Sequence, residues 1–407
     1  MRSKPQLLYQ CKKAEYFRQS TFLMLISPLT LNNICHWIRI MLKFIKSEMV
    51  FVIALAAAVL SSFFNPPSQE WISAVDFRTL ALLFCLMGVS EGFKSSGLFT
   101  SVASSLTRKA GNISRLSLFL VMIVFFSSML FTNDVALLMF VPFTMMIMDK
   151  EKRDENYIIR IVILETIAAN LGSMTTPVGN PQNIFICSYF SLDAGTFFAA
   201  ILPYSLISLI MVLIIWRIFL AEREKLETEN DDDTSADRKK TLMFSVFLVL
   251  ALLSVFRVLD WKILFIAELA VLIIFDRKTL LKIDYILLLT FVCFFIFSAN
   301  IRSIDTVERL LTSFMDKSAI ATSAIVSQVI SNVPAAILLS PFTDSAEGVL
   351  VGTDIGGLGT PVASLASLIS MKFYFKRERG KKGKYIILFL ILNFALLAIL
   401  AAFSLVL

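Results

Sequence analysis

Charged residues and histidine are scarce in this chain. Only 17% of its 407 residues are charged and 57% are hydrophobic, with a mean hydropathy of +0.78. Soluble globular proteins have about 25% charged and about 45–50% apolar residues, so the composition excludes an ordinary soluble domain. The single histidine, His36, lies in the N-terminal arm, away from the motifs described below. The composition therefore predicts a polytopic membrane protein.

Cysteine motifs, catalytic motifs and barrel-like alternation are also missing. The five cysteines have no CxxC spacing, so neither a disulfide framework nor a zinc site is indicated. No HExxH, GxSxG or paired GxGD motif is present, so we do not expect an intramembrane enzyme and assign no catalytic residue. No ten-residue alternating pattern recurs, which favours a helical bundle over a transmembrane barrel.

Apolar blocks fill the chain after residue 48. At roughly 20 residues per bilayer crossing, they provide about ten membrane elements and predict an all-α polytopic membrane protein. The blocks are Met49–Phe64, Thr79–Gly92, Leu116–Phe131, Val135–Met148, Tyr157–Cys187, Gly195–Leu220, Thr241–Phe256, Ile263–Phe275, Tyr285–Ile301, Leu310–Leu339, Val349–Phe375 and Tyr385–Leu405.

One long hydrophilic segment, residues 222–240, divides these blocks into two halves. We expect an N-terminal arm outside the bundle (1–47), a first transmembrane half (48–221), a cytoplasmic linker (222–240) and a second transmembrane half (241–407). Met41 shortly precedes the first strong apolar run. We hypothesise that translation starts there, and N-terminal sequencing of the native protein tests this.

The net charge of +7 is interpreted as an orientation signal and not as a nucleic-acid surface. Lys and Arg cluster in alternate connecting segments, and basic residues accumulate on the cytoplasmic side of membrane proteins. The pattern predicts an integral protein of the cell inner or plasma membrane, with a cytoplasmic N-terminus and nine full crossings. Lipid is an expected partner and nucleic acid is not.

Two apolar blocks contain a polar break. Thr132-Asn133-Asp134 interrupts the first, Leu116–Met148, and Ser331-Asn332-Val333-Pro334 interrupts Leu310–Leu339. Polar backbone at membrane depth must be satisfied by protein or by a water-filled cavity. We therefore expect two re-entrant hairpins, the first entering from the cytoplasm and the second from the outer side.

The two breaks belong to an internal repeat. Residues 128–133 match residues 327–332 at an offset of 199, and Pro142 and Pro341 follow at the same distance. A second pair, residues 170–178 and 354–362, places a Gly-containing Thr-Pro break in each half. With nine crossings the halves have opposite orientation. An inverted-topology repeat with two opposed hairpins and two broken helices is an architecture of secondary transporters.

Broken helices suit the binding of small ions. Their backbone N–H ends attract anions and their carbonyl ends coordinate Na⁺. Polar side chains and prolines at the breaks form the predicted substrate site, although Ser, Thr and Asn also join membrane helices to one another. The predicted substrate-binding residues are Thr132, Asn133, Thr176, Pro177, Asn180, Asn183, Ser331, Asn332, Thr360 and Pro361.

Acids and glycines at the same breaks are the candidates for ion coupling. A carboxylate at the bilayer centre costs about 2.5–3.5 kcal/mol on insertion scales and is usually functional. Break glycines permit unusual backbone angles and close approach to a ligand. Glu165 has two interpretations, as a further coupling acid or as the ion-pair partner of Arg160. The predicted ion-coupling residues are Asn133, Asp134, Gly172, Asn332, Asp354 and Gly356.

A family resemblance is carried by three stretches. Residues 170–183 read NLGSMTTPVGNPQN and resemble the signature of the citrate transporter-like permeases of the ion transporter superfamily. This group includes divalent anion/sodium symporters, arsenite permeases and some sodium/proton antiporters. Residues 331–335 and 352–366 are most similar to the arsenite-permease branch. The resemblance covers nearly the whole chain from about Met41.

The resemblance implies a scaffold domain and a transport domain with two opposed hairpins, often in a homodimer, moving by an elevator mechanism. In the divalent anion symporters, hydroxyl-Asn-Thr hairpin tips bind carboxylates, and hairpin Asn residues and broken-helix backbone hold Na⁺. Here Asp134 and Val333 replace the expected Thr, and Pro361 is followed by Val-Ala-Ser. These departures weaken the case for a symmetric dicarboxylate clamp.

The sequence thus predicts a secondary active transporter for a small anion, either a di- or tricarboxylate or an inorganic oxyanion, coupled to Na⁺ or H⁺. No other cofactor and no resident metal are expected. The alternative on the same scaffold is an arsenite efflux permease or a sodium/proton antiporter, in which Asp134 and Asp354 would alternate their protonation.

Overall fold

The computed structural model describes residues 41, 48–63, 65–66, 69–222 and 236–406. These residues form helices joined by short connections, and no strand occurs among them. Contacts divide the chain into residues 1–53 and 54–407, and the features discussed below lie in the second unit. The predicted N-terminal arm with His36, apart from Met41, and most of the predicted linker lie outside the described residues.

Side-chain caps explain where several helices of the first half begin. Asp76, Asn112, Asp154 and Asp193 each accept a hydrogen bond from a backbone N–H in the first turn of the helix that follows. The helices are α3 (Met49–Ser61), α4 (Gln69–Ala74), α5 (Phe77–Ser96), α6 (Leu98–Ala110), α7 (Ile113–Ser128), α8 (Asn133–Lys150), α9 (Glu155–Ser173), α10 (Pro181–Tyr189) and α11 (Ala194–Phe219).

The second half repeats part of this order. The pair α17–α18 and the broken pair α19–α20 follow one another as α7–α8 and α9–α10 do, and helix interruptions occur where the sequence predicts them. The helices are α12 (Arg238–Val255), α13 (Trp261–Phe275), α14 (Arg277–Leu280), α15 (Tyr285–Arg302), α16 (Asp305–Lys317), α17 (Ala319–Ile330), α18 (Asn332–Leu339), the short 3₁₀ helix η1 (Ser340–Phe342), α19 (Ala346–Ile355), α20 (Leu365–Phe375) and α21 (Lys382–Phe403).

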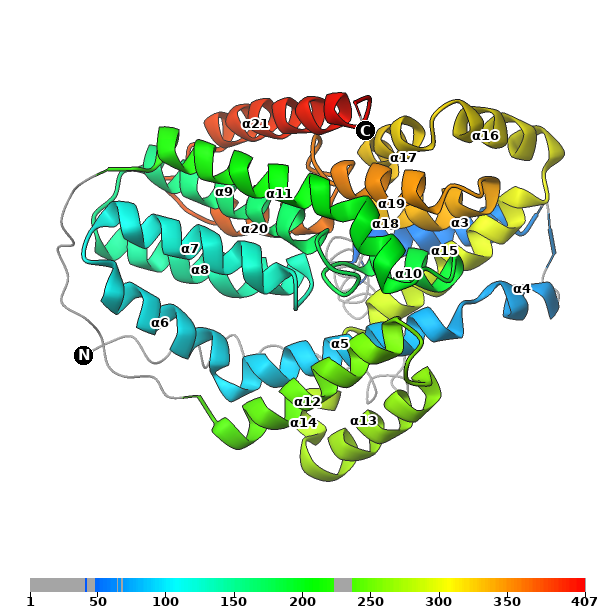
Figure 1. Cartoon of the computed structure of the whole chain (residues 1–407), viewed down its shortest axis with the longest axis horizontal. Helices are drawn as coiled ribbons and strands as arrows, with labels where there is room; N and C mark the ends of the chain where they lie inside the picture. Colours follow the sequence, from blue (N-terminus) through cyan, green and yellow to red (C-terminus); the bar gives the residue numbers. More distant parts are fainter. Residues whose placement is uncertain (1–40, 42–47, 64, 67–68, 223–235, 407) are drawn as a thin grey trace, which may run out of the picture. The chain divides into compact units, whose positions relative to one another are not determined.

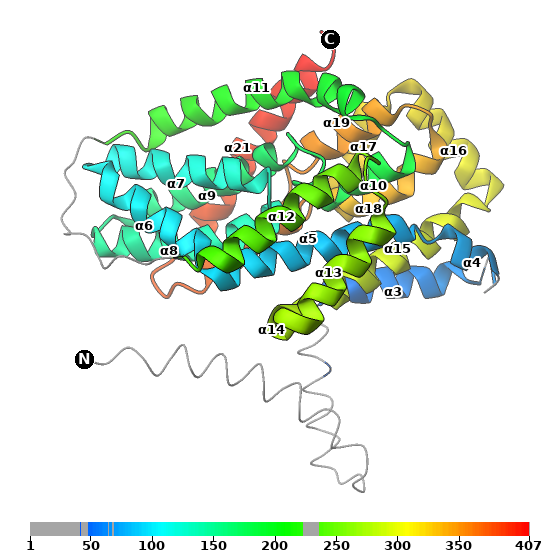
Figure 2. The same ribbon diagram turned by 60° about the horizontal axis from the view of Figure 1, so that its bottom comes forward.

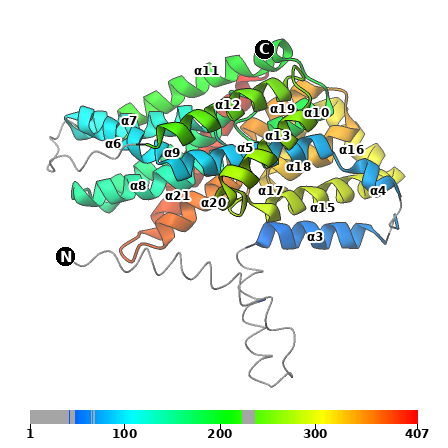
Figure 3. The same ribbon diagram turned by 90° about the horizontal axis from the view of Figure 1, so that it is seen from below.

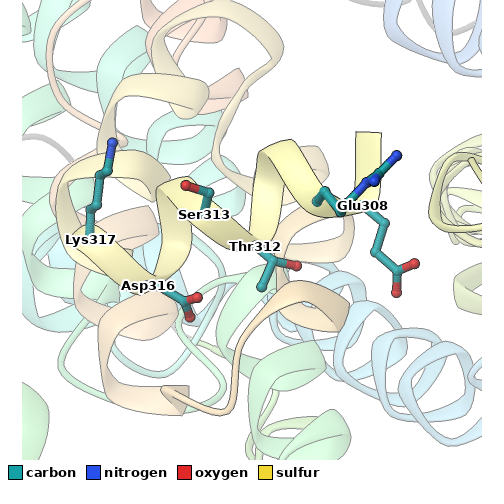
Figure 4. Close-up of a pocket in the computed structure, with 6 residues that line it drawn as sticks. Glu308, Thr312, Ser313, Asp316 and Lys317 are labelled. Carbon is teal, nitrogen blue, oxygen red and sulfur yellow. The ribbon is translucent and has the colours of Figure 1, made fainter. Parts of the chain in front are cut away.

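One predicted block has a wrong boundary. Its first residues, from Leu310, belong to the separate helix α16, which ends at Lys317 before Ser318 caps α17. Helix α16 is amphipathic: Met315 is buried, while charged and hydroxyl side chains line an open recess along it (Figure 4). The apolar residues Leu310 and Phe314 alternate with these polar residues in sequence, so hydropathy alone merged α16 with the next helix.

Helices from the two halves pack against each other around the interruptions. In the first half α7 and α8 pack on α9, and in the second half α17 packs on α18 and α19 (Figure 1). Across the halves, α20 packs on α8 and α9 (Figure 3), and α10 packs on α18 and α19 (Figure 2). The ends of the four interrupted segments are therefore brought together inside the bundle.

Three described helices are long and apolar enough to cross a membrane: α11, α15 and α21. Shorter apolar helices include α3, α7 and α17. Many of their large apolar side chains are exposed, among them Ile218 of α11, Leu289 of α15 and Ile391 of α21. Exposed apolar surface on long helices suits lipid contact. The number of full crossings and the orientation of each hairpin stay predictions.

Candidate functional site

Asn133 lies where the interruptions of the first half meet. Its backbone N–H donates to the carbonyl of Gly179 at 3.1 Å, and its Nδ2 donates to Oδ1 of Asn170 at 3.0 Å. The same Asn170 oxygen accepts from Oγ of Ser364 at 3.0 Å, and Nδ2 of Asn170 donates to Oγ of Ser367 at 3.2 Å. We call Asn133, Asn170, Ser364 and Ser367 the first cluster; all four are buried.

Asn332 occupies the corresponding place in the second half. Its backbone N–H donates to the carbonyl of Ala363 at 2.9 Å. Oδ1 of Asp354 accepts from Nδ2 of Asn180 at 2.9 Å and from Nε2 of Gln182 at 3.2 Å. A Cβ at Gly357 would lie 3.0 Å from Nδ2 of Asn332 and 3.3 Å from the Asp354 carbonyl oxygen, so these groups are neighbours. We call Asn180, Gln182, Asn332 and Asp354 the second cluster.

Three members of each cluster correspond in the repeat. Asn133 aligns with Asn332, Asn170 with Asp354, and Asn180 with Ser364. The contact from Asn180 to Asp354 is therefore the counterpart of the contact from Ser364 to Asn170. Each contact joins one half of the chain to the other. A residue at the interruption of one broken helix thus bonds to a residue at the interruption of the corresponding broken helix.

A second matched pair of hydrogen bonds ties each Thr-Pro loop to the helix pair of its own half. Thr176 donates its hydroxyl to the carbonyl of Met129, and Thr360 donates to the carbonyl of Gln328 at 2.9 Å. Both threonines thus satisfy the carbonyl of an interrupted helix end. This gives Thr176 and Thr360 a structural reason to be present in addition to their predicted role in substrate binding.

The clusters differ in charge. The first has the neutral amide of Asn170 where the second has the carboxylate of Asp354. Asp354 is 3% exposed, and its Oδ2 has no hydrogen-bond partner among the described residues. A buried carboxylate is costly unless it is paired, protonated or coordinated to a cation. Asp354 is therefore suited to binding a proton or a cation.

Ser331 is strained at the second interruption. Its φ is 76° and its ψ is 153°, a region that side chains with a Cβ rarely adopt, whereas its repeat partner Thr132 has an ordinary φ of −48°. Residues held in such conformations cluster at functional sites. The unusual backbone angles of Ser331 turn the chain sharply, and α18 begins at the next residue, Asn332.

The role predicted for Gly172 and Gly356 through unusual backbone angles is wrong. Neither has a positive φ; of the break glycines only Gly359 does, at 102°. Gly172 instead allows α9 to contact α7, because a Cβ there would lie 2.2 Å from the Phe125 carbonyl oxygen. A Cβ at Gly356 would lie 2.9 Å from Cα of Ala324. Close helix packing explains both glycines.

Several predicted site residues lie at the breaks beside the clusters, and Asp134 and Asn183 contact them through backbone N–H groups, that of Asn183 donating to Oδ1 of Asn180 at 2.9 Å. Asp134 is half-buried, and its backbone N–H donates to Oδ1 of Asn133 at 3.0 Å. Thr132 precedes α8 without a side-chain cap. Nδ2 of Asn183 donates to the Thr176 carbonyl at 3.2 Å and so holds the first loop. Pro177 is buried and Pro361 is half-buried in the two loops.

Five polar residues of the site were missed from sequence: Asn170, Gln182, Gln328, Ser364 and Ser367. Nε2 of Gln328 donates to the carbonyls of Gly356 and Leu358 at 2.8 and 2.9 Å, and its Oε1 accepts from the Thr360 N–H at 2.9 Å. Extending the second repeat alignment by two residues would have paired Ser364 with Asn180. No sequence signal distinguishes Gln328, whose repeat partner is Met129.

Helix ends of both kinds meet at the two clusters. The first cluster gathers the N-termini of α8 and α20 with the C-terminal part of α9, and the second gathers the N-termini of α10 and α18 with the C-terminus of α19. N-terminal N–H groups favour anions, and C-terminal carbonyls favour cations. The arrangement is chemically suited to holding a small anion and its counter-cation together.

Comparison with known proteins gives consistent matches. The citrate transporter family model matches residues 37–363. The uncharacterized transporter MJ0456 of Methanocaldococcus jannaschii is 26% identical over 356 residues, which cover 88% of this chain and 96% of that protein. Inner membrane protein YbiR of Escherichia coli is 29% identical over 336 residues, covering 81% and 89%. The low-affinity phosphate transporter PHO90 of Saccharomyces cerevisiae is 28% identical over 135 residues, covering 32% and 15%.

Proposed function

The chain belongs to the citrate transporter family, and from this premise we propose that it is a secondary active transporter that moves a small anion across the membrane with Na⁺ or H⁺. It is an integral membrane protein of transporter type. The observation that supports the proposal most directly is the pairing of the two clusters, in which each hairpin asparagine lies beside a broken helix and each broken helix contacts its counterpart.

We propose that the pairs α7–α8 and α17–α18 are re-entrant hairpins that enter from opposite sides of the membrane. The matched contacts of Asn133 and Asn332 support a structural repeat, because an axis that exchanges the hairpins also exchanges their contacts. In this proposal the opposite orientation predicted for the two halves makes the repeat inverted. Alternating access would then move the hairpins and broken helices together relative to the remaining helices, as in an elevator, within a homodimer.

The substrate in this proposal is held by the N–H ends of the interrupted helices and by the predicted polar side chains beside them. No Lys or Arg belongs to either cluster, so charge compensation falls to helix ends and the coupling ion. A di- or tricarboxylate or an inorganic oxyanion fits such a site. The name of the PHO90 relative, a phosphate transporter, supports keeping inorganic oxyanions among the candidates.

The coupling ion is proposed to bind at Asn133 with the Gly172 region, and at Asn332 and Asp354 with the Gly356 region. Of these groups Asp354 is the strongest candidate, because one of its oxygens lacks a partner among the described residues. Asp134 would repel an anion unless it is protonated or paired with a cation. The unsatisfied Asp354 oxygen also supports the second candidate, a sodium/proton antiporter or arsenite efflux permease on the same scaffold.

Ligand-dependent thermal stabilisation of the purified protein tests the proposal. Citrate, succinate, phosphate, sulfate and arsenite are screened with and without Na⁺ at two pH values. A ligand at a hundredfold excess over Kd raises the free energy of unfolding by about 2.7 kcal/mol. Stabilisation by an anion that requires Na⁺ or low pH supports the anion transporter. Stabilisation by Na⁺ or low pH alone, with no anion effect, favours the antiporter.

Uptake into proteoliposomes then separates binding from transport. The stabilising anion should accumulate when a Na⁺ or pH gradient is imposed, and collapse of that gradient should stop accumulation. Uptake that is unaffected by both gradients would contradict a coupled mechanism.

A further inference from the structure

Glu165 is a buried acid that neither cluster contains. It lies on α9, between helices α8 and α20, and its side chain is 0% exposed. Oε1 accepts a hydrogen bond from the hydroxyl of Thr144 on α8. Oε2 has no hydrogen-bond partner among the described residues. A carboxyl group with one satisfied and one unsatisfied oxygen at this depth must either carry a proton or face a cation.

The cation that the sequence offered for Glu165 is engaged elsewhere. NH2 of Arg160 lies 3.6 Å from Oε1 of Glu222, its Nε donates to the Asn156 carbonyl at 3.1 Å, and its guanidinium lies 5.5 Å from the Tyr157 ring centre. The predicted Arg160–Glu165 alternative is therefore wrong. Within the described part of the chain, no ion pair involves Glu165.

The neighbours of α9 place their charges near helix ends, away from the middle of the helix where Glu165 lies. The titratable group that faces this level from α21 is the buried phenol of Tyr385. The other charged or titratable residues on the packed helices are Arg115 of α7, Asp134, Asp149 and Lys150 of α8, Tyr204 and Arg217 of α11, Glu347 and Asp354 of α19, Lys372 and Tyr374 of α20, and Lys382 and Lys384 of α21.

We propose that Glu165 is a proton-binding site of the transporter, distinct from the two clusters. In this proposal the proton is carried on Oε2, while Oε1 accepts from Thr144. Release of the proton to water leaves a carboxylate that the α8–α9 interface cannot hold without water or a cation. Loss of the proton therefore favours separation of α8 from α9 at this point, and binding of the proton favours their contact.

The same two helices hold the first cluster, so the proton on Glu165 is linked to it mechanically. Asn133 begins α8 and Asn170 lies five residues beyond Glu165 on α9. The adjacent Thr166 donates to Oγ of Ser370 at 2.7 Å, and Ser370 donates to the Ser367 carbonyl at 3.1 Å. Ser367 in turn accepts from Asn170 at 3.2 Å. The coupling role, but not the protonation itself, rests on the proposed function.

Glu268 provides a matched control. It is also 0% exposed, and neither of its oxygens accepts a hydrogen bond from an N–H or O–H group of the described residues, although the thiol of Cys85 lies beside it. It lies on α13 against Gly88 of α5, where a Cβ would be 2.5 Å from its Oε1, and belongs to neither α8 nor α9. E268Q therefore removes a buried acid of the same kind without changing the α8–α9 interface.

Infrared difference spectroscopy of the purified full-length chain, without any anion, tests the protonation. The wild-type spectrum minus that of E165Q should contain, at neutral pH, the carbonyl stretch of one protonated carboxylic acid. The band should shift in T144V, which removes the hydrogen bond to Oε1, and return in T144S. A carboxylate band in place of the acid band would overturn the proposal. If E165Q misfolds, the shift of the acid band between the wild type and T144V decides the protonation state in its place.

The pH dependence of uptake tests the coupling role, with citrate and phosphate as probes in proteoliposomes. A single-proton step changes uptake about tenfold per pH unit on its limiting arm, and E165Q should flatten that arm whereas E268Q should keep it. An acid band assigned to Glu165 with an unchanged pH profile in E165Q would overturn its coupling role. Absence of uptake of any anion by the wild type would instead count against the proposed function, and the infrared result would stand by itself.

Discussion

Asn180 of the first half donates its side-chain N–H to Oδ1 of Asp354 in the second half at 2.9 Å, and both side chains are buried. The residues are 174 positions apart in the chain, and each lies at an interruption of a broken helix. Their repeat partners, Ser364 and Asn170, make the corresponding contact at 3.0 Å. A change of side chain or position at either interruption therefore alters a direct hydrogen bond to the opposite half.

Replacing Asp354 by Asn should change the Na⁺ or pH dependence of transport while the protein still folds, because the amide keeps the shape but loses the negative charge.

In a double-mutant cycle of D354N with N180A, the two changes should be non-additive by about 0.5–3 kcal/mol in the free energy of unfolding, as expected for residues in contact. Uptake and thermal unfolding measure the two effects. D193N, at an exposed helix cap, is the control; an unchanged ion dependence in D354N would move coupling to another acid.

Replacing Asn133 or Asn332 by Ala should abolish uptake without preventing membrane insertion. Each side chain is 5% exposed and begins a helix at an interruption, where an alanine cannot orient an ion or a loop. N393A is the matched control: Asn393 is fully buried in α21, and its Nδ2 donates to the Phe389 carbonyl of the same helix at 2.8 Å. Wild-type uptake in N133A and N332A would refute the assignment of the site.

Replacing Gly172 by Ala should destabilise the protein by about 1–3 kcal/mol, the usual cost of overpacking a well-packed contact. The added Cβ would lie 2.2 Å from the Phe125 carbonyl oxygen, a backbone atom that cannot move without shifting α7. G383A is the control, because a Cβ at Gly383 has no neighbour within 4 Å. Thermal unfolding of both variants decides the point; equal melting temperatures would show that α7 and α9 adjust freely.

Replacing Glu155 by Gln should destabilise the protein more than replacing Asp149 by Asn. Arg377 bonds to both, with NH2 at 2.7 Å from each carboxylate, and its hydrogen bonds to Asp149 and then Glu155 raise the pKa of Arg377 above its ordinary value. The Asp149 side chain is 52% exposed and Glu155 15% exposed. Exposed pairs contribute about 0.2–1 kcal/mol, whereas hydrogen bonds to charged groups contribute about 1.5–3 kcal/mol. Unfolding at low and high salt measures the difference.

Asp276 should contribute to stability at neutral pH and lose that contribution in acid. Burial by itself raises the pKa of Asp276. Hydrogen bonds from Lys240 and Thr279, together with the charge of Lys240, lower the pKa by more than burial raises it and leave it below its ordinary value. Lys240 Nζ lies 2.7 Å from Oδ2 of Asp276. A carboxyl group whose pKa is lower in the folded protein stabilises the folded state at any pH above its unfolded pKa, which is about 3.9 for Asp. This stabilisation is lost as the pH falls from that value through the lower pKa of the folded state. D276N should be less stable than the wild type at neutral pH, and the difference should shrink below about pH 4. A pH-independent difference would indicate that the ion pair is not its source.

The sequence by itself determined the class of protein and the positions of its helix interruptions. Hydropathy is a local property, and so is the effect of Thr, Asn, Gly and Pro on a helix, so α7–α8, α9–α10, α17–α18 and α19–α20 break where the repeat predicts. The boundary at Leu310 failed because only the short hydrophilic stretch Asp316-Lys317-Ser318 separates the amphipathic helix α16 from the apolar helix α17.

Only the tertiary structure decided which of these residues meet. Asp354 contacts Asn180 and Gln182, Arg160 contacts Glu222 in place of Glu165, and Gly172 serves the contact of α9 with α7. Side-chain partners across distant helices depend on how the helices cross and rotate, which is set by packing over the whole bundle and leaves no periodic signal in the chain. The repeat aligns the neutral Asn170 with the acid Asp354. The packing of one half on the other decides that Asp354 is buried, where a carboxylate needs a proton or a cation.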